Sequence, residues 1–287
     1  MIDFLKYRAL CLGFSVVLLF TGFTAYFYRG GFAYSIDFTG GCEIRLAFEK
    51  PLEIAALRKL FTAEQFGEAV VQSIEGGQEY LIKISKYDSN IEEIIKKIVE
   101  SSFVDNTVTI KAVEKIGPEA GSEVRYNAIM SIFLALITMG LYIMLRQKYA
   151  YAIGATAALA HDILVILTYC LVFQEPISLI VLAAILSILG YSINDTIIVF
   201  SRINDNLGLS KKMNGFEVVN HSINQTLSRT ILTSFSTLLS MLAVYFFGGA
   251  ALKSFATVMI IGIIFGTYSS IYIASPIMLY FNDQFQN

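Results

Sequence analysis

The sequence predicts a polytopic α-helical membrane protein of six transmembrane helices, with an α+β domain outside the membrane between the first and the second. Hydrophobic residues make up 55% of the 287 residues and charged residues only 15%, which is too apolar for a soluble domain of this size. Six apolar runs are long enough to cross a bilayer core, which needs about 20 helical residues. One long segment, 30–124, has instead the charged, mixed composition of a soluble domain.

The six runs divide the chain into three parts. Residues 1–29 hold the N-terminus and the first span, 30–124 form the external domain, and 125–287 form a five-helix membrane domain. The first run follows Lys6 and Arg8 as in a secretory signal. It is too long for a signal and has no convincing cleavage site, so we interpret it as an uncleaved anchor. The spans are predicted at 9–28, 126–145, 149–173, 177–200, 230–252 and 254–281.

Basic residues near the span ends predict the orientation, because cytoplasmic segments are enriched in lysine and arginine. With the N-terminus inside, eight basic residues lie at inner ends of the spans and three at outer ends. Both termini are therefore expected in the cytoplasm and residues 30–124 in the periplasm. The inner set is Lys6, Arg8, Arg146, Lys148, Arg202, Lys211, Lys212 and Arg229, and the outer set is Arg29, Arg125 and Lys253.

Hydrophobic alternation and turn signals in the external segment predict the order β-α-β-β-α-β of a ferredoxin-like domain. Gly76-Gly77 separates the second and third strands, as in a tight hairpin. This fold does not by itself identify a ligand. The strands are expected at 42–48, 69–75, 79–84 and 107–113, and the helices at 53–66 and 91–99.

The segment between the fourth and fifth spans, 201–228, is expected to be a cytoplasmic loop. It is polar and contains Lys211-Lys212. Its apolar positions fit an amphipathic helix on the membrane surface, and a connector that packs on the helical bundle fits equally well. These positions are Phe216, Val218, Val219 and Ile223.

Asp195 lies in the fourth span, within a stretch of 24 residues that carries no other charge. A carboxylate in hydrocarbon costs on the order of 2.5–3.5 kcal/mol on insertion scales, so it is rarely kept without a partner or a task. Tyr191 and Asn194 share the side of the helix that carries Asp195, and this polar stripe is expected to face a bundle interior. Arg229 enters the next span from the same inner side and is expected to reach Asp195.

A proton switch is the hypothesis that this pair suggests. Burial favours the neutral form of a carboxyl group, and a guanidinium favours the ionised form. Proton binding to Asp195 would therefore release Arg229. The alternative is a static ion pair that fixes helix register. Asp162, in the third span, is a further candidate for the proton pathway or a hydrogen-bonding group, and His161 is expected to be a hydrogen-bonding residue.

Small residues in the last span predict close helix packing. Gly262 and Gly266 form a G-x-x-x-G pattern, and Ser269 and Ser270 follow it. The fifth span contributes hydroxyl groups on the face of Arg229, so a packed polar interior is expected. These hydroxyl residues are Thr226, Thr230, Thr233, Thr237 and Ser240.

The sequence carries no signature of an enzyme, a metal site or a nucleic-acid-binding protein. It lacks G-x-S-x-G, H-E-x-x-H and a Walker lysine. Its three cysteines have no metal or redox spacing, and its net charge is −2 without a basic block. We therefore expect no catalysis and no cofactor, and any work must draw on an ion gradient or a partner.

Six motifs, in this order, resemble the SecF family, which forms the smaller membrane subunit of the SecDF protein-export factor. The resemblance covers essentially the whole chain. The motifs are Asp37-Phe38-Thr39-Gly40-Gly41, Ile116-Gly117-Pro118, Ala160-His161-Asp162, Gly190-Tyr191-Ser192-Ile193-Asn194-Asp195-Thr196, Gln225-Thr226-Leu227-Ser228-Arg229-Thr230 and Gly266-Thr267-Tyr268-Ser269-Ser270-Ile271.

The resemblance implies a six-span half of the RND transporter architecture in the bacterial inner membrane. It implies SecD as the partner subunit, the SecYEG channel, YajC and YidC as further partners, and SecA as a functional partner. The family uses the proton-motive force to draw preproteins outward, and its proton-conducting positions match Asp195 and Arg229. Two other functions stay open at this point: half of an RND-type efflux pump, and a scaffold for the translocon that transports nothing.

Overall fold

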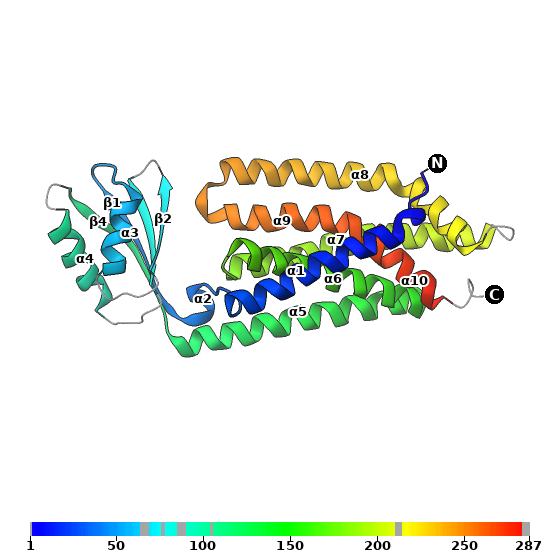
Figure 1. Cartoon of the computed structure of the whole chain (residues 1–287), viewed down its shortest axis with the longest axis horizontal. Coiled ribbons are helices and arrows are strands. Elements are labelled where there is room, and N and C mark those ends of the chain that lie inside the picture. The colour runs from blue at the N-terminus through cyan, green and yellow to red at the C-terminus, as the bar shows by residue number, and fades with distance from the viewer. Residues whose placement is uncertain are drawn as a thin grey trace.

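The computed structural model describes residues 2–63, 69–75, 78–84, 90–103, 106–209 and 214–282. A helical bundle and a small α/β unit lie end to end in an elongated molecule (Figure 1). The α/β unit is attached where the first long helix ends and the second begins, as the sequence predicts.

Within these described residues, six helical stretches are long and apolar enough to cross a membrane, which confirms the predicted number of spans. Helix α6 (Tyr149–Phe173) has the predicted bounds. Each other helix extends beyond its apolar run at one end or both, because those runs mark only the part that hydrocarbon would surround. After the short η1 (Leu5–Tyr7) the other helices are α1 (Arg8–Arg29), α5 (Pro118–Arg146), α7 (Leu179–Leu209) and α8 (Gly215–Phe247), followed by a last span built from α9 (Gly249–Ser269), the π-helical η2 (Ser270–Ala274) and α10 (Ser275–Phe281). The predicted end of the fifth span at residue 252 is wrong, since that helix ends at Phe247 and the last span already begins at Gly249.

The α/β unit has the β-α-β-β-α-β order expected of a ferredoxin-like domain. Its antiparallel sheet has the strand order β2-β3-β1-β4. Gly76-Gly77, the predicted hairpin turn, lies outside the described residues. The elements are β1 (Gly41–Phe48), α3 (Ile54–Ala63), β2 (Val70–Glu75), β3 (Glu79–Ile84), α4 (Ile91–Ser102) and β4 (Val108–Ile116).

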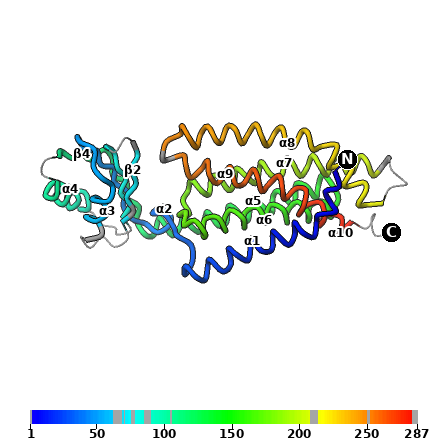
Figure 2. Tube along the Cα trace, turned by 45° about the horizontal axis from the view of Figure 1, so that its top comes forward, coloured from blue at the N-terminus to red at the C-terminus, as the bar shows by residue number. Residues whose placement is uncertain are grey.

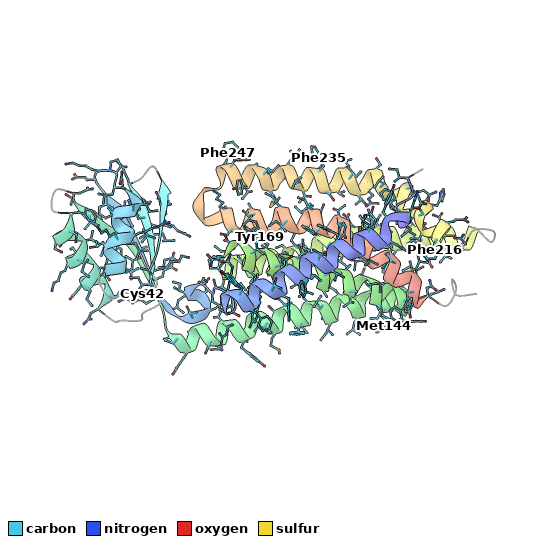
Figure 3. The ribbon with its side chains drawn as sticks, in the orientation of Figure 1. Cys42, Met144, Tyr169, Phe216, Phe235 and Phe247 are labelled. Atoms are coloured by element: carbon cyan, nitrogen blue, oxygen red, sulfur yellow. The ribbon has the colours of Figure 1, made fainter. Side chains whose placement is uncertain are left out.

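Alternating side chains of the strands and the apolar faces of α3 and α4 form one hydrophobic core. Strand β1 alternates buried and less buried positions, as its sequence predicts. Cys42, at the start of β1, belongs to this core and is 0% exposed; Figure 3 labels it in the part of the sheet nearest the bundle. Its burial is typical of a free cysteine that packs as a small hydrophobic residue.

The bundle has three buried spans and three peripheral ones. Helices α6, α7 and the last span are about half buried, whereas α1, α5 and α8 are mostly exposed along their length. Figure 2 shows α1 and α8 on opposite sides of the bundle, with α7 and α9 between them. Helix α7 therefore contacts α6, α8 and α9, and its side chains meet residues from each.

The segment 201–228 differs from the expected loop. Its first part continues α7 to Leu209, and its last part is the beginning of α8 at Gly215. Val219 and Ile223 are buried in the core that α6, α7 and the last span form, and Val218 is also buried, so these three do not lie on a membrane surface. The fourth predicted position, Phe216, is exposed. The alternative of a segment packed on the bundle is correct, and residues 210–213 lie outside the described residues.

The N-terminal residues are fastened to this helical extension. The side-chain amide of Asn224 accepts a hydrogen bond from Ile2 N (2.9 Å) and donates one to Ile2 O (2.7 Å). The side-chain oxygen of Asn220 accepts a hydrogen bond from Phe4 N (2.8 Å). The N-terminus, the beginning of α8 and the end of α10 thus lie at the end of the bundle that is distant from the sheet (Figure 1).

Candidate functional site

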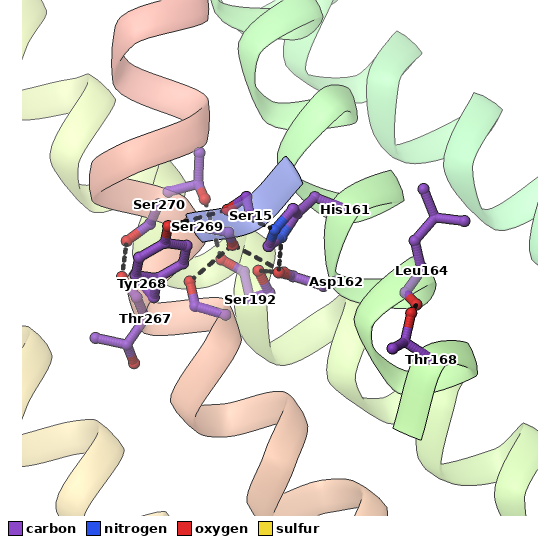
Figure 4. A network of polar contacts seen from close by, with 12 residues as sticks. Ser15, His161, Asp162, Leu164, Thr168, Ser192, Thr267, Tyr268, Ser269 and Ser270 are labelled. Carbon is purple, nitrogen blue, oxygen red and sulfur yellow. Dashed lines mark hydrogen bonds and ion pairs between the residues drawn. The ribbon is translucent and has the colours of Figure 1, made fainter. Parts of the chain in front are cut away.

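Asp162 lies at the centre of a polar cluster that joins three helices inside the bundle. It is 0% exposed. Its Oδ2 accepts hydrogen bonds from Ser192 Oγ of α7 (2.6 Å) and Ser269 Oγ of α9 (3.0 Å), while Oδ1 lies 3.4 Å from Nδ1 of His161 (Figure 4). We call Ser15, His161, Asp162, Ser192, Tyr268 and Ser269 the Asp162 cluster.

The Asp162 cluster continues to α1 through a directed chain of hydrogen bonds. Tyr268 donates its only hydroxyl proton to the carbonyl of Cys11 (2.6 Å), so it accepts from Ser15 Oγ (2.9 Å). Ser15 in turn accepts from Nε2 of His161 (3.1 Å). Because Nε2 then carries a hydrogen, the contact between Nδ1 and Asp162 requires a further proton on one of these two atoms. His161 has the hydrogen-bonding role that its position suggests.

A second polar cluster surrounds Asp195, which lies one helical turn after Ser192 on α7. Asp195 is 1% exposed, and its Oδ2 accepts from Ser234 Oγ of α8 (3.4 Å). Ser234 shares a hydrogen bond with Thr267 of α9 (2.7 Å) and accepts another from the Tyr191 hydroxyl (3.2 Å). We call Tyr191, Asp195, Ser234 and Thr267 the Asp195 cluster.

Arg229 does not form the expected ion pair in this structure. Its side chain is exposed on α8, and among the salt bridges of the described residues, with nitrogen–oxygen distances up to 4.0 Å, none joins it to Asp195. Its neighbour Thr230 is 2% exposed, and the Thr230 hydroxyl has no hydrogen-bond partner in the described part of the chain. A polar position next to Arg229 therefore faces the bundle without a partner.

The polar stripe expected on α7 is rotated from its predicted position. Asn194 is exposed, and it is Ser192, Asp195 and Thr196 that are buried. A helical pattern gives the spacing of polar residues but not the direction of the partner helices, and Asn194 lies about 100° from Asp195 around the helix. Asn194 therefore does not belong to either cluster.

Several site residues escaped the sequence analysis as individuals. Ser15, Ser192, Ser234, Thr267 and Tyr268 are hydroxyl residues in apolar helices, where such residues are common and bond mostly to their own backbone. Only tertiary packing shows which of them point at a carboxyl group. Ser192, Thr267 and Tyr268 lie within two of the motifs that carry the resemblance, which is the one signal that could have identified them.

The predicted small residues set the approach of α9 to α7. A Cβ atom on Gly262 would lie 2.4 Å from Cγ1 of Ile188, and one on Gly266 would lie 3.1 Å from Cβ of Ser192. Ser269 is buried and donates to Asp162. Ser270 is also buried, but it bonds to the carbonyl of Thr267 at the start of the π-helical turn. The two glycines thus permit the contact that brings Ser269 to Asp162.

Comparisons with known proteins agree with this architecture. Residues 94–284 match a family model described as protein export membrane protein SecD/SecF, C-terminal. The SecF translocase subunit of Calditerrivibrio nitroreducens is 38% identical over 283 residues, which cover 96% of this chain and 93% of the relative. The SecF subunit of Thermodesulfovibrio yellowstonii is 36% identical over 282 residues, 97% of this chain and 94% of the relative.

Two solved structures of SecDF are also similar to this chain. The crystal structure of SecDF from Thermus thermophilus, a translocon-associated membrane protein, superposes with a TM-score of 0.86 at 34% identity over 97% of this chain. SecDF in its super-membrane-facing form has a TM-score of 0.74 over 99% of this chain. The chain spans only 38% and 39% of those two SecDF chains. By sequence and by structure, this chain belongs to the SecF family, whose members are membrane subunits of the protein translocase.

Proposed function

We propose that the chain works with SecD to complete preprotein translocation across the bacterial inner membrane, driven by the proton-motive force after the ATP-driven step of SecA. The observation that carries this proposal is the environment of Asp195. A carboxyl group that is 1% exposed in a membrane span has a single hydroxyl donor among the described residues, at 3.4 Å. An ionisable residue of this kind inside a membrane is by default a proton or ion site.

The switch that we propose has two arrangements of Asp195 and Arg229. A neutral Asp195 needs no counter-charge and fits the arrangement seen here, with Arg229 exposed and outside ion-pair distance. An ionised Asp195 would attract the guanidinium and shift α8 against α7. One proton that crosses the membrane releases about 2.3 kcal/mol per 100 mV, and repeated transfers bias such an equilibrium.

Other members of the two clusters have supporting roles in this proposal. Tyr191 donates to Ser234, which donates to Asp195. Thr230 belongs to neither cluster, but its buried hydroxyl, next to Arg229, has no hydrogen-bond partner among the described residues. Asp162 and His161, whose Oδ1 and Nδ1 lie 3.4 Å apart, form the fixed part of the pathway. Each of these assignments depends on the proton-driven function.

The exposed polar residues of α7 and α8 support SecD as the partner. Arg229 and Asn194 are exposed in the isolated chain, and an arginine that faces lipid is costly. A partner subunit that packs on α7 and α8 would cover both. Phe235 and Phe247, which Figure 3 labels on α8, leave that helix an apolar exposed side for lipid or for the same partner.

The location and the remaining partners follow from the same function. We propose cytoplasmic N- and C-termini and a periplasmic α/β unit, because the basic residues gather at the end of the bundle that is distant from the sheet. The SecYEG channel, with YajC and YidC, is the site at which a SecD-bound subunit of this kind would act on a translocating preprotein.

Asp195→Asn tests the switch, because it keeps the size and the acceptor oxygen of the side chain but removes the titratable proton. We expect the variant to export preprotein at the level of vesicles treated with an ionophore, while it still co-purifies with SecD. Asp205→Asn, an exposed position on the same helix, is the matched control and should retain gradient-dependent export. The measurement is preprotein translocation into inverted membrane vesicles with and without a proton gradient.

Arg229→Lys extends the test to the second partner. Lysine keeps the charge but loses the planar fork that binds a carboxylate through two hydrogen bonds, so export should also fall. Full gradient-dependent export in Asp195→Asn would refute the switch and favour a scaffold. If complex recovery fell together with export, the pair would be a static clamp. Recovery of the chain without SecD would favour an efflux pump.

A further inference from the structure

The motif Asp37-Phe38-Thr39-Gly40-Gly41 has no part in the proton switch, yet it lies where the α/β unit meets the bundle. Asp37 belongs to the short α2 (Ile36–Thr39). Its Oδ2 accepts a hydrogen bond from the backbone N–H of Leu179 (3.1 Å), the first residue of α7, and another from Ser35 Oγ (2.8 Å). Asp37 thus supplies an N-terminal cap to a helix that begins 142 residues later in the chain.

Backbone hydrogen bonds hold the same two segments together. Ser35 N donates to the carbonyl of Ile177 (2.9 Å), and Ile177 N donates to the carbonyl of Ala33 (2.8 Å). The two bonds form a parallel β-bridge between Tyr34 and Ile177. The entry to α7 is therefore paired with the segment that precedes β1, and we call residues 33–40 and 177–179 the α7 joint.

Close glycine contacts fix the joint against α5. Gly40 has a left-handed φ of +75°, and a Cβ atom on Gly121 of α5 would lie 2.6 Å from the nitrogen of Gly40. Ile36 and Phe38 are buried, so the joint has an apolar interior. The joint is therefore closely packed on the side of α5 as well as paired with the entry to α7.

The joint connects the proton site to the sheet through two rigid elements. Helix α7 runs without interruption from Leu179 past Asp195, which is 16 residues, or about 24 Å at 1.5 Å per residue. On the other side, β1 begins at Gly41, directly after α2. The α/β unit has other attachments, through Gly117 to α5 and from β2 to α9, but the α7 joint is the one that ends on the helix that carries Asp195.

We propose that Asp37 is a positioning residue that couples movements of α7 to the α/β unit, so that the α7 joint moves as one body during export. This inference rests on the proposed proton-driven function. It names the route by which a movement at Asp195 reaches the α/β unit. An axial shift of α7 at Asp195 would be transmitted to the start of β1 without a change in the joint itself.

A disulfide across the joint tests its rigidity. Tyr34→Cys and Ile177→Cys place two cysteines on bridge partners, which neighbouring strands hold about 4.8 Å apart, within the range that a disulfide spans. The background lacks Cys11, Cys42 and Cys170. Because the joint moves as one body, the oxidised protein should keep gradient-dependent export, measured in inverted vesicles that contain the SecD complex. Loss of export on oxidation, with recovery on reduction, would overturn the proposal.

Substitution of Asp37 tests its role as the cap. Asp37→Asn keeps an acceptor oxygen and should behave as wild type, whereas Asp37→Ala removes it. In Asp37→Ala, we expect the first amides of α7 to exchange hydrogen about fivefold faster and the gradient-dependent part of export to fall, while gradient-independent export and complex recovery stay. An equal fall of all three quantities would make Asp37 merely structural and overturn the coupling role.

Two readouts separate this inference from the proposed function. If wild-type vesicles export preprotein without dependence on the gradient, the proton-driven function fails. Hydrogen exchange needs no gradient, so it still tests the joint in that case. Unchanged exchange at the start of α7 in Asp37→Ala would refute the role of Asp37 as a cap. A normal gradient dependence in wild type, together with unchanged export in Asp37→Ala, would leave the function standing and refute the coupling.

Discussion

Asp162 and Asp195 are both buried in the same bundle, but their hydrogen-bonding capacity is used differently. An ionised carboxylate has about four acceptor sites. Asp162 uses both oxygens, with donors from α7 and α9 and a contact to His161. In the part of the chain that the structure describes, Asp195 has one donor, at 3.4 Å. Asp162 is therefore suited to hold three helices in place, and Asp195 has acceptor sites left for the partner that the proposed switch requires.

Removal of the Ser192 hydroxyl tests this difference at the residue scale. Ser192→Ala leaves the buried Asp162 without its shortest hydrogen bond, so the SecD complex should be less stable by about 1–3 kcal/mol. Ser187→Ala is the matched control, since Ser187 is exposed on the same helix and donates to its own backbone at Ala183. The thermal unfolding midpoint of the purified complex measures the effect.

The ratio of export with and without a gradient completes the Ser192 test. It should not change in Ser192→Ala, because Asp162 is assigned to the fixed part of the bundle. Equal midpoints for the two serine variants would show that the short hydrogen bond contributes nothing. If the variant lost its response to the gradient at an unchanged unfolding midpoint, Asp162 would belong to the switch and not to the fixed part of the bundle.

At the scale of elements, the apolar runs predict the spans well because the bilayer requires uninterrupted hydrophobic length. Hydrophobic length does not predict helical structure outside the hydrocarbon core. The helical residues 201–209 and 215–228 are stabilised by contacts between α7, α8 and the N-terminal residues, such as the bonds of Asn220 and Asn224 to Ile2 and Phe4, and such contacts leave no periodic signal that marks their partner. The α/β unit was predictable element by element, since its strands alternate and its helices have one apolar face.

Close packing of α9 on α7 gives a prediction at this scale. Gly262→Ala should destabilise the complex by about 1–3 kcal/mol, the usual cost of overpacking, because its Cβ would collide with the buried, branched Ile188. Gly190→Ala is the control: a Cβ at that helical position meets nothing within 4 Å, so better helix propensity should make it neutral or stabilising by up to about 1 kcal/mol.

The Ile188 contact itself can be tested by a second substitution. Addition of Ile188→Ala removes the atoms that collide and should make the double variant more stable than the sum of the single effects predicts. Thermal unfolding of the purified complex compares the wild type, the three single variants and the double variant. Equal midpoints for Gly262→Ala and Gly190→Ala would mean that α9 does not approach α7 as closely as the structure places it.

At the scale of the whole molecule, the proposed function assigns different tasks to the two ends of the molecule. The Asp195 cluster lies within the bundle, and the sheet lies at the end opposite to both termini (Figure 1). A subunit that binds protons in the membrane and acts on a chain outside it needs a mechanical link between these places. The continuous α7 and the joint at its beginning supply one, provided that the sheet is on the outer side.

The orientation can be decided with single cysteines on a background without Cys11, Cys42 and Cys170. A cysteine in place of Lys111, which is exposed on β4, should react with a membrane-impermeant thiol reagent in intact spheroplasts. A cysteine in place of Asp205, exposed near the C-terminal end of α7, should react only after the membrane is permeabilised. The native Cys42 is a poor reporter because it is fully buried. Reaction of the cysteine at 205 in intact spheroplasts would invert the topology, and with it the direction in which a proton gradient could drive the switch.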